Sequence, residues 1–124
     1  MHAGADLFLR TAYCPDHFSH RIELLDPDAS TRSTICVTIA GPLCFSGDVL
    51  LKNKSMLEMY VSDKIVILDA GANTISLFSR HCSRVSPAVI GFRSFESDSL
   101  ERSRFRCARL RDEETVDQVL NFWD

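Results

Sequence analysis

The chain has 124 residues, of which 45% are hydrophobic and 25% charged, and its net charge is −3. This size and composition are typical of one globular domain, which buries roughly two-thirds of the surface its unfolded chain exposes. The slightly acidic balance provides no general attraction to nucleic acid or to an anionic membrane.

The sequence also carries signals about its compartment. No stretch approaches the run of about 18 apolar residues that a membrane helix needs, and the N-terminus lacks a basic region followed by a long apolar segment. The five cysteines are odd in number and include no CxxC pair, which favours reduced thiols over a disulfide framework. We therefore expect a soluble, cytoplasmic protein. The cysteines are Cys14, Cys36, Cys44, Cys82 and Cys107.

Short alternating or continuously apolar runs follow one another along the chain and predict β-strands, because they are β-branched in places and bounded by turn residues. Residues 26–30 predict a turn, and residues 94–103 predict a polar surface connector. The predicted strands cover residues 21–26, 34–40, 49–51, 64–69, 88–92 and 104–110.

The last segment, residues 112–123, has helical spacing of Val116, Val119, Leu120 and Trp123 after an acidic start. Negative charge at that end is favoured by the helix dipole, so we predict one short C-terminal helix. The whole pattern predicts a mainly β fold, an antiparallel Greek-key-like β-barrel or sandwich of about six to eight strands, in a single domain over residues 1–124.

The sequence GPLCFSGDVL, residues 41–50, joins two of these runs and is the strongest candidate for a functional loop. Gly41 and Gly47 permit close backbone approaches, and Pro42 fixes its own φ angle. The loop therefore displays Cys44 and Asp48, a thiol and a carboxylate that could transfer protons or pair with charges. The alternative is that Cys44 acts as a small apolar residue.

Other candidates have simpler readings. His17 and His20 form an HxxH motif, and His81 and Cys82 could add a nitrogen and a sulfur ligand for zinc. Structural zinc sites typically show two pairs of ligands, and no such pairing repeats in this sequence. We therefore predict no metal site. Nothing in the sequence places His81 or His17 beside Cys44 as a base. The basic segment 76–84 could face an anion or a partner carboxylate, although a solvated strand edge explains the same charges. The basic side of 104–111 is expected to be the solvent face of a strand.

Four segments in the same order resemble the C-terminal β-domain of the fold-type III pyridoxal-phosphate decarboxylases, the family of the diaminopimelate, ornithine and arginine decarboxylases. In that family a TIM barrel carries the Schiff-base lysine and most cofactor contacts, and the β-domain completes active sites across a head-to-tail dimer. The segments are DLFLR with Tyr13 and His20, which resembles "LxRPxLYxxxH"; GPLCFSGD, which resembles "GPxCESxD"; DAGANTISLFSRHCSR, which resembles "xxGAYxxSxxSxFN"; and 109–116, which resembles the closing "RxRET" stretch.

The resemblance implies roles for individual residues. Cys44 would be the catalytic thiol that reaches the partner subunit's active site and helps to protonate the carbanion left by decarboxylation. Asp48 would belong to the same interface loop, either orienting it or pairing with a basic residue of the partner. Arg10 would bind the distal carboxylate of a diaminopimelate-like substrate, and Tyr13 would be a further substrate-binding residue.

The chain also departs from the family's pattern. Phe45 stands at the substrate position where a glutamate or aspartate holds the distal amine, and an aromatic ring cannot accept that hydrogen bond. Asn73 stands at the cofactor-binding position of the GAY tyrosine. Thr11 replaces the proline of the RP pair, and the spacing from arginine to tyrosine is one residue short.

Two functions follow. The first is the C-terminal domain of a pyridoxal-phosphate-dependent amino-acid decarboxylase, with altered substrate preference and inactive alone, because this length cannot also encode a TIM barrel of about 200 residues or more. Its expected partners are a TIM-barrel domain and a second copy of the chain. The alternative is a non-catalytic interaction module, which binds a decarboxylase subunit or itself and lost the family residues at Phe45 and Asn73.

Overall fold

The computed structural model describes residues 1–26, 28–71, 73–95 and 104–124, although the side chains of Ala29 and Arg104 are not described. The chain forms two compact units, residues 1–82 and 83–124, and each is described by itself. The first unit contains the loop that carries Cys44.

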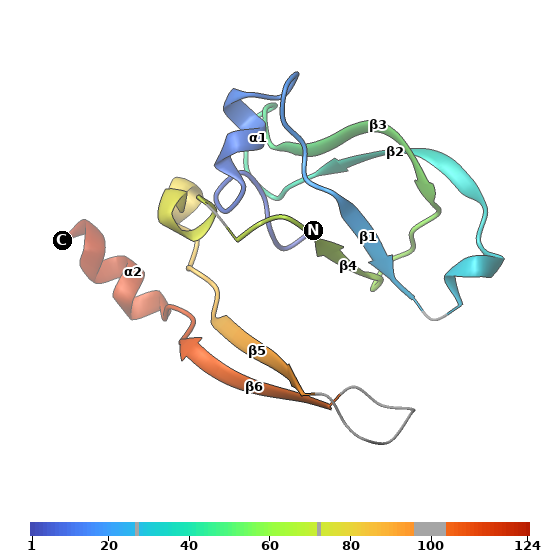
Figure 1. Cartoon of the computed structure of the whole chain (residues 1–124). Helices are drawn as coiled ribbons and strands as arrows, with labels where there is room; N and C mark the ends of the chain where they lie inside the picture. Colours follow the sequence, from blue (N-terminus) through green and yellow to red (C-terminus); the bar gives the residue numbers. More distant parts are fainter. Residues whose placement is uncertain (27, 72, 96–103) are drawn as a thin grey trace. The chain divides into compact units, whose positions relative to one another are not determined.

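The first unit contains two antiparallel strand pairs (Figure 1). One is a hairpin of β2 with β3, with a register shift near Ile39, and the other pairs β1 with β4. All four predicted strands of this unit are present, and β3 runs six residues further than expected because its polar end still pairs with β2. The elements are α1 (Leu9–Tyr13), β1 (Ile22–Leu25), η1 (Ala29–Thr31), β2 (Thr34–Ala40), β3 (Val49–Leu57), β4 (Lys64–Ile67), η2 (Ile75–Leu77) and η3 (His81–Ser83).

The core of this unit forms where the apolar faces of these strands meet. Ile39 of β2 and Leu50 and Leu51 of β3 are buried. Partly buried side chains from β1, β4 and the N-terminal segment surround them. Burial of apolar surface stabilises by about 25 cal/mol per Å², so burial of these three side chains favours the observed register of the hairpin. The surrounding residues are Phe8, Ile22, Val37, Met56, Met59, Ile65 and Ile67.

The short helix α1 was not predicted. It has no capping side chain at Phe8, its first flanking residue, although the hydroxyl of Thr11 donates to the Phe8 carbonyl at 2.8 Å. A five-residue helix is too short for a 3.6-residue period to show in the sequence. It packs near β3 and buries Thr11 (Figure 1).

A charge cluster fixes the chain around β4. Arg32 donates to Asp63 through two nitrogens and pairs with Asp26 at 2.7 Å. The three side chains are about 85% shielded from solvent, and Arg32 also lies over the ring of Tyr60 at 4.8 Å. A planar guanidinium suits this arrangement because it can hold two carboxylates at once.

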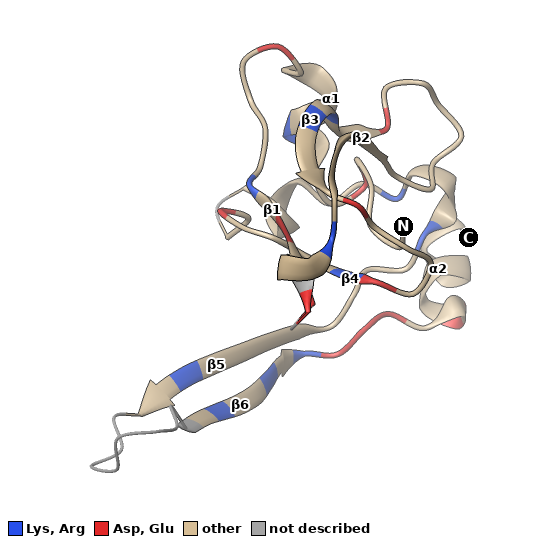
Figure 2. Ribbon diagram, turned by 90° about the vertical axis from the view of Figure 1, so that its right-hand side faces the viewer, with Lys and Arg blue, Asp and Glu red and all other residues tan. Residues whose placement is uncertain are grey.

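The second unit is a hairpin followed by a helix. Strand β5 (Val89–Phe95) pairs antiparallel with β6 (Arg104–Arg111), and helix α2 spans Val116–Trp123. Both strands carry arginines, which colour the ribbon blue along each of them (Figure 2). The basic side chains of β6 after Arg104 are exposed, as expected, but Phe105 and Leu110 are exposed as well.

The C-terminal helix begins four residues later than predicted. Asp112 to Glu114 precede it, and Thr115 caps it by a capping box with Gln118. The carboxylate of Glu114 accepts a hydrogen bond from the N–H of Ser86 at 2.8 Å, in the segment before β5. The acidic residues before the helix therefore indicate that a helix follows, while the hydroxyl of Thr115, which accepts from an N–H of the first turn, determines where it begins.

The fold class is mainly β with a short C-terminal helix, as predicted. Among the described residues the strands pair two by two and close no barrel, so the Greek-key-like barrel detail is not confirmed. The predicted turn at 26–30 includes Pro27 and the connector includes 96–103, and both lie partly outside the described residues. The described chain holds no helix of the length and apolarity that a bilayer crossing requires.

Candidate functional site

The loop between β2 and β3, residues 41–48, displays Cys44 at its tip. The loop closes where the N–H of Gly41 donates to the carbonyl of Asp48 at 2.8 Å. The N–H of Asp48 in turn donates to the carbonyl of Phe45 at 3.2 Å. Cys44 and Phe45 are exposed between these closing contacts.

Asp48 is buried, with only 3% of its surface exposed. Its Oδ1 accepts from the N–H of Ala5 and its Oδ2 from the N–H of Leu43, each at 2.7 Å. A Cβ on Gly4 would lie 2.6 Å from Oδ1, and one on Gly41 would overlap the same carboxylate. Both glycines therefore permit the close approach of Asp48, whose expected contact with a partner stays a prediction.

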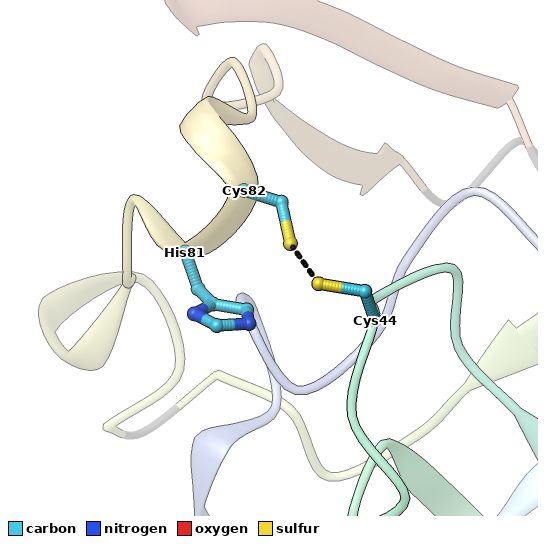
Figure 3. Close-up of side chains that lie close together, drawn as sticks. All are labelled: Cys44, His81 and Cys82. Carbon is cyan, nitrogen blue, oxygen red and sulfur yellow. Dashed lines mark hydrogen bonds between the residues drawn. The ribbon is translucent and has the colours of Figure 1, made fainter.

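Cys44 lies beside two residues that follow it by almost forty positions (Figure 3). Its Sγ is 3.4 Å from the Sγ of Cys82, within hydrogen-bond distance for thiols. The ligand atoms of Cys44, His81 and Cys82 all lie within 4.8 Å of one another, and the three residues are exposed. The tertiary fold thus places His81 beside Cys44, which the sequence did not predict.

The neighbouring thiol changes the protonation of Cys44. The hydrogen bond with Cys82 raises the pKa of Cys44 above its ordinary value, and charge repulsion from Cys82 and desolvation raise it further. Cys44 therefore stays a protonated thiol at neutral pH. This state suits a proton donor better than a nucleophile, which reacts as the thiolate.

One N-terminal segment supports both halves of this cluster. The N–H of Ala5 donates to Asp48 in the loop that carries Cys44. The next residue, Asp6, accepts at its backbone carbonyl from the N–H of Ser79 at 2.9 Å, in the segment that carries His81. Two adjacent buried residues thus hold two distant loops against each other.

A small pocket adjoins the cluster. It measures about 260 Å³, and Phe45, Leu43 and His81 line it together with Ala5 and Leu9. The rings of Phe45 and His81 meet edge to face, with their centres 5.6 Å apart. An aromatic ring thus occupies the place where a carboxylate is expected in the family, and Asp6 and Ser79 line the same pocket.

The remaining predicted residues lie apart from the cluster. Arg10 and Tyr13 are exposed on α1, and the Arg10 guanidinium lies over the ring of Phe18 at 4.7 Å. Asn73 is exposed on the turn before η2, with a left-handed φ of 55°. The structure leaves their substrate and cofactor roles as predictions.

The two histidines of the HxxH motif lie in different surroundings. His20 is buried, its Nδ1 lies 3.1 Å from the carbonyl of Leu68, and its ring meets the edges of Phe8 and Phe18. His17 is exposed. His20 is thus a packed histidine, and the partners of His81 and Cys82 come from the loop of Cys44 instead.

Sequence comparisons identify what the chain is similar to. The family model described as "pyridoxal-dependent decarboxylase, C-terminal sheet domain" matches residues 2–71. The diaminopimelate decarboxylase of Helicobacter pylori is 34% identical over 82 residues, which cover 66% of this chain and 20% of that enzyme. That of Zymomonas mobilis is 28% identical over 98 residues, 79% of this chain and 23% of that enzyme. The chain thus spans about a fifth of the length of these curated relatives.

Solved structures share its fold. The diaminopimelate decarboxylase of Helicobacter pylori, crystallised with L-lysine, superposes with a TM-score of 0.75 at 24% identity over 98% of this chain and 27% of that chain. A crystal structure from Aquifex aeolicus reaches a TM-score of 0.78 at 20% identity, with the same coverage of 98% and 27%. At these identities the likeness establishes the fold.

Proposed function

Because the chain belongs to the family of pyridoxal-dependent decarboxylase C-terminal sheet domains, we propose that it completes the active site of an amino-acid decarboxylase. It would do so together with a TIM-barrel domain, across the interface of a dimer, and would be inactive alone. The observation that carries this proposal is the family match through the loop of residues 41–48, with Cys44 exposed at its tip.

In this proposal Cys44 is the proton donor. Its pKa is raised by the hydrogen bond with Cys82, so its Sγ holds a proton at neutral pH. The thiol would give that proton to the substrate carbon that has lost its carboxylate, and solvent would restore it. Asp48 would keep the loop in position from inside the domain.

The cofactor is pyridoxal phosphate, which supplies an electron sink when bound. The exposed side-chain amide of Asn73 could make one hydrogen bond to the cofactor. An asparagine supplies neither the Schiff-base amine nor a phosphate cradle, which the family resemblance assigns to the barrel. The residues of this chain therefore fit a supporting contact, and we assign the cofactor's main binding site to the partner domain.

The substrate is an amino acid without a distal ammonium at the position of Phe45. The exposed aromatic ring favours an apolar or neutral side chain there, because it cannot accept a hydrogen bond from an amine. Arg10, which is exposed on α1, would bind a carboxylate if the substrate carries one.

A non-catalytic interaction module is the second candidate, favoured by the packing of Phe45 against His81. The exposed Phe105 and Leu110 would then form part of a binding surface for a decarboxylase subunit or another copy. Restoration of glutamate at Phe45 and tyrosine at Asn73 would create no activity in a barrel complex under this alternative.

The first test is the size of the native polypeptide on a denaturing gel, detected with an antibody against this domain. A band of about 45–55 kDa, equal to this domain plus a barrel of about 250 residues or more, supports the decarboxylase proposal. A band near 14 kDa without a barrel chain that co-purifies would overturn it and favour the interaction module.

The second test is CO₂ release by the purified native protein with pyridoxal phosphate. Cys44→Ser should lower kcat by roughly 10²-fold or more, the usual contribution of a general acid. Cys36→Ser is the matched control, since Cys36 is an exposed thiol on β2. Equal effects of the two substitutions would contradict the assignment of Cys44.

A further inference from the structure

The cluster of Cys44, His81 and Cys82 brings two sulfurs and an imidazole to one point on the surface (Figure 3). The three potential ligand atoms lie within 4.8 Å of one another, and the two sulfurs are 3.4 Å apart. Two cysteines and a histidine form a common zinc-binding set, and soft thiolates select zinc over calcium and magnesium. We propose that these three side chains bind one Zn²⁺ ion.

The distance between the two sulfurs is close to that of tetrahedral coordination. Zinc bonds of about 2.3 Å to sulfur and about 2.0–2.1 Å to nitrogen place two ligand sulfurs about 3.8 Å apart and a sulfur and a nitrogen about 3.6 Å apart. The two sulfurs at 3.4 Å therefore need to separate by only a few tenths of an ångström. The sulfur–nitrogen distances lie within 4.8 Å, so they need to shorten by at most about 1.2 Å, and rotation of the two exposed cysteine side chains can supply this movement.

Three protein ligands leave the fourth position of zinc open. Sites of this type bind a water molecule or a substrate at that position, in contrast to closed structural sites with four protein ligands. The cluster is exposed, so an ion can enter from solvent. The neighbouring pocket of about 260 Å³ shares His81 with the cluster and would receive an exchangeable ligand of the metal.

The ligands are held in place by the rest of the unit. Ala5 and Asp6 connect the loop of Cys44 to the segment of His81 through backbone hydrogen bonds. The ring of His81 lies edge to face with that of Phe45, which restricts its rotation. Cys82 has a left-handed backbone, with φ of 60° and ψ of 25°, that directs its side chain toward Cys44 (Figure 3). Such preorganisation strengthens metal binding because less side-chain freedom is lost.

The proposal goes beyond the decarboxylase function and requires a different protonation state of Cys44. The family pattern quoted for residues 69–84 has phenylalanine and asparagine where this chain has His81 and Cys82. Zinc binds the thiolate, so coordination releases the Cys44 proton. A zinc-bound Cys44 has no proton to donate, and the metal would therefore inhibit the proposed decarboxylation.

A disulfide between Cys44 and Cys82 is the rival outcome. It would require the sulfurs to close from 3.4 Å to about 2.05 Å and would need an oxidant. It would also not involve His81, although a ring nitrogen of His81 lies within 4.8 Å of both sulfurs. We therefore favour the metal, and a phosphine reductant in every assay keeps the thiols available.

The experiment is a titration of the purified chain with Zn²⁺ against a chromogenic chelator, and a parallel titration with Co²⁺ by absorption spectroscopy. We expect one Zn²⁺ per chain, release of protons, and for Co²⁺ a sulfur-to-metal charge-transfer band with tetrahedral d–d bands. The Co²⁺ spectrum reports thiolate ligation in the unaltered chain and so requires no substitution.

Substitution then assigns the ligands. Cys82→Ser and His81→Ala should each weaken Zn²⁺ binding more than about tenfold. Cys36→Ser and His17→Ala are matched controls, because both residues are exposed outside the cluster, and they should leave affinity unchanged. Circular dichroism checks the fold of each variant.

Three results would overturn the proposal: no saturable binding by the reduced chain, a Co²⁺ spectrum without thiolate bands, or equal losses in the cluster and control variants. None of these results bears on the decarboxylase function, since that function is read from CO₂ release in the presence of a barrel. Loss of decarboxylation, conversely, leaves the metal titration unaffected.

Discussion

The carboxylate of Asp48 holds the backbone of Ala5, which lies 43 positions earlier in the chain, by a hydrogen bond of 2.7 Å. The same carboxylate holds Leu43 at the base of the Cys44 loop. One buried side chain thus connects the N-terminal segment to the loop that the family resemblance singles out.

Asp48→Asn should destabilise the first unit. The carboxylate accepts from two N–H groups, while an asparagine offers one oxygen and an amide that must face the second N–H. An unmet buried hydrogen bond costs about 1–3 kcal/mol, which thermal and urea unfolding would detect. Asp69→Asn is the control, because Asp69 is exposed and should change the melting temperature little. Equal effects of both substitutions would contradict a structural role for Asp48.

Gly41→Ala should destabilise for a steric reason. The added Cβ would overlap the carboxylate of Asp48, so the loop must shift at a cost of about 1–3 kcal/mol. Gly71→Ala is a matched control, since a Cβ there meets no atom within 4 Å. The control should be neutral or stabilising by up to about 1 kcal/mol, because alanine restricts the unfolded chain. A stable Gly41→Ala variant would show that Asp48 can move away without loss.

Arg32→Gln should make stability less sensitive to acid. The hydrogen bond from Arg32, followed by the N–H of Tyr60, lowers the pKa of Asp63 below its ordinary 3.8. Because the folded-state pKa is the lower one, this stabilisation is complete above the unfolded pKa and is lost as the pH falls through the folded pKa. The melting temperatures of wild type and variant should therefore differ most near neutral pH and converge in acid.

A matched substitution, Arg21→Gln, provides the control for that series. Arg21 lowers the pKa of Asp69 in the same direction, but the two side chains are 69% and 59% exposed. Solvent screens such a pair, so its pH-dependent difference should be smaller than that of Arg32. A difference for Arg32→Gln that is constant with pH would assign its effect to packing against Tyr60.

Thr115→Ala should weaken the C-terminal helix. The Thr115 hydroxyl accepts from the N–H of Gln118, and the Gln118 side chain accepts from the N–H of Thr115. Loss of such a cap costs about 1 kcal/mol, which amide hydrogen exchange along α2 can report locally. Thr115→Ser keeps the hydroxyl and should preserve protection. Unchanged exchange in the alanine variant would show that other contacts start the helix.

The amino-acid sequence by itself determined the existence of the strands, because alternation of apolar residues is local and follows the two-residue period of the backbone. It located the loop of residues 41–48 and, through the resemblance, the family. It misplaced the start of α2 because Asp112 to Glu114 carry the expected charge while Thr115 makes the cap. It missed α1 because five residues show no period.

Only the tertiary structure decided which side chains meet. Asp48 proved to be buried because Gly4 and Gly41 leave space for its carboxylate, a fact that depends on segments far apart in sequence. His81 and Cys82 lie beside Cys44 because hydrogen bonds from Ala5 and to Asp6 join the two loops, which are also far apart in sequence. Proximity in space depends on how distant segments pack, and no local periodicity encodes it.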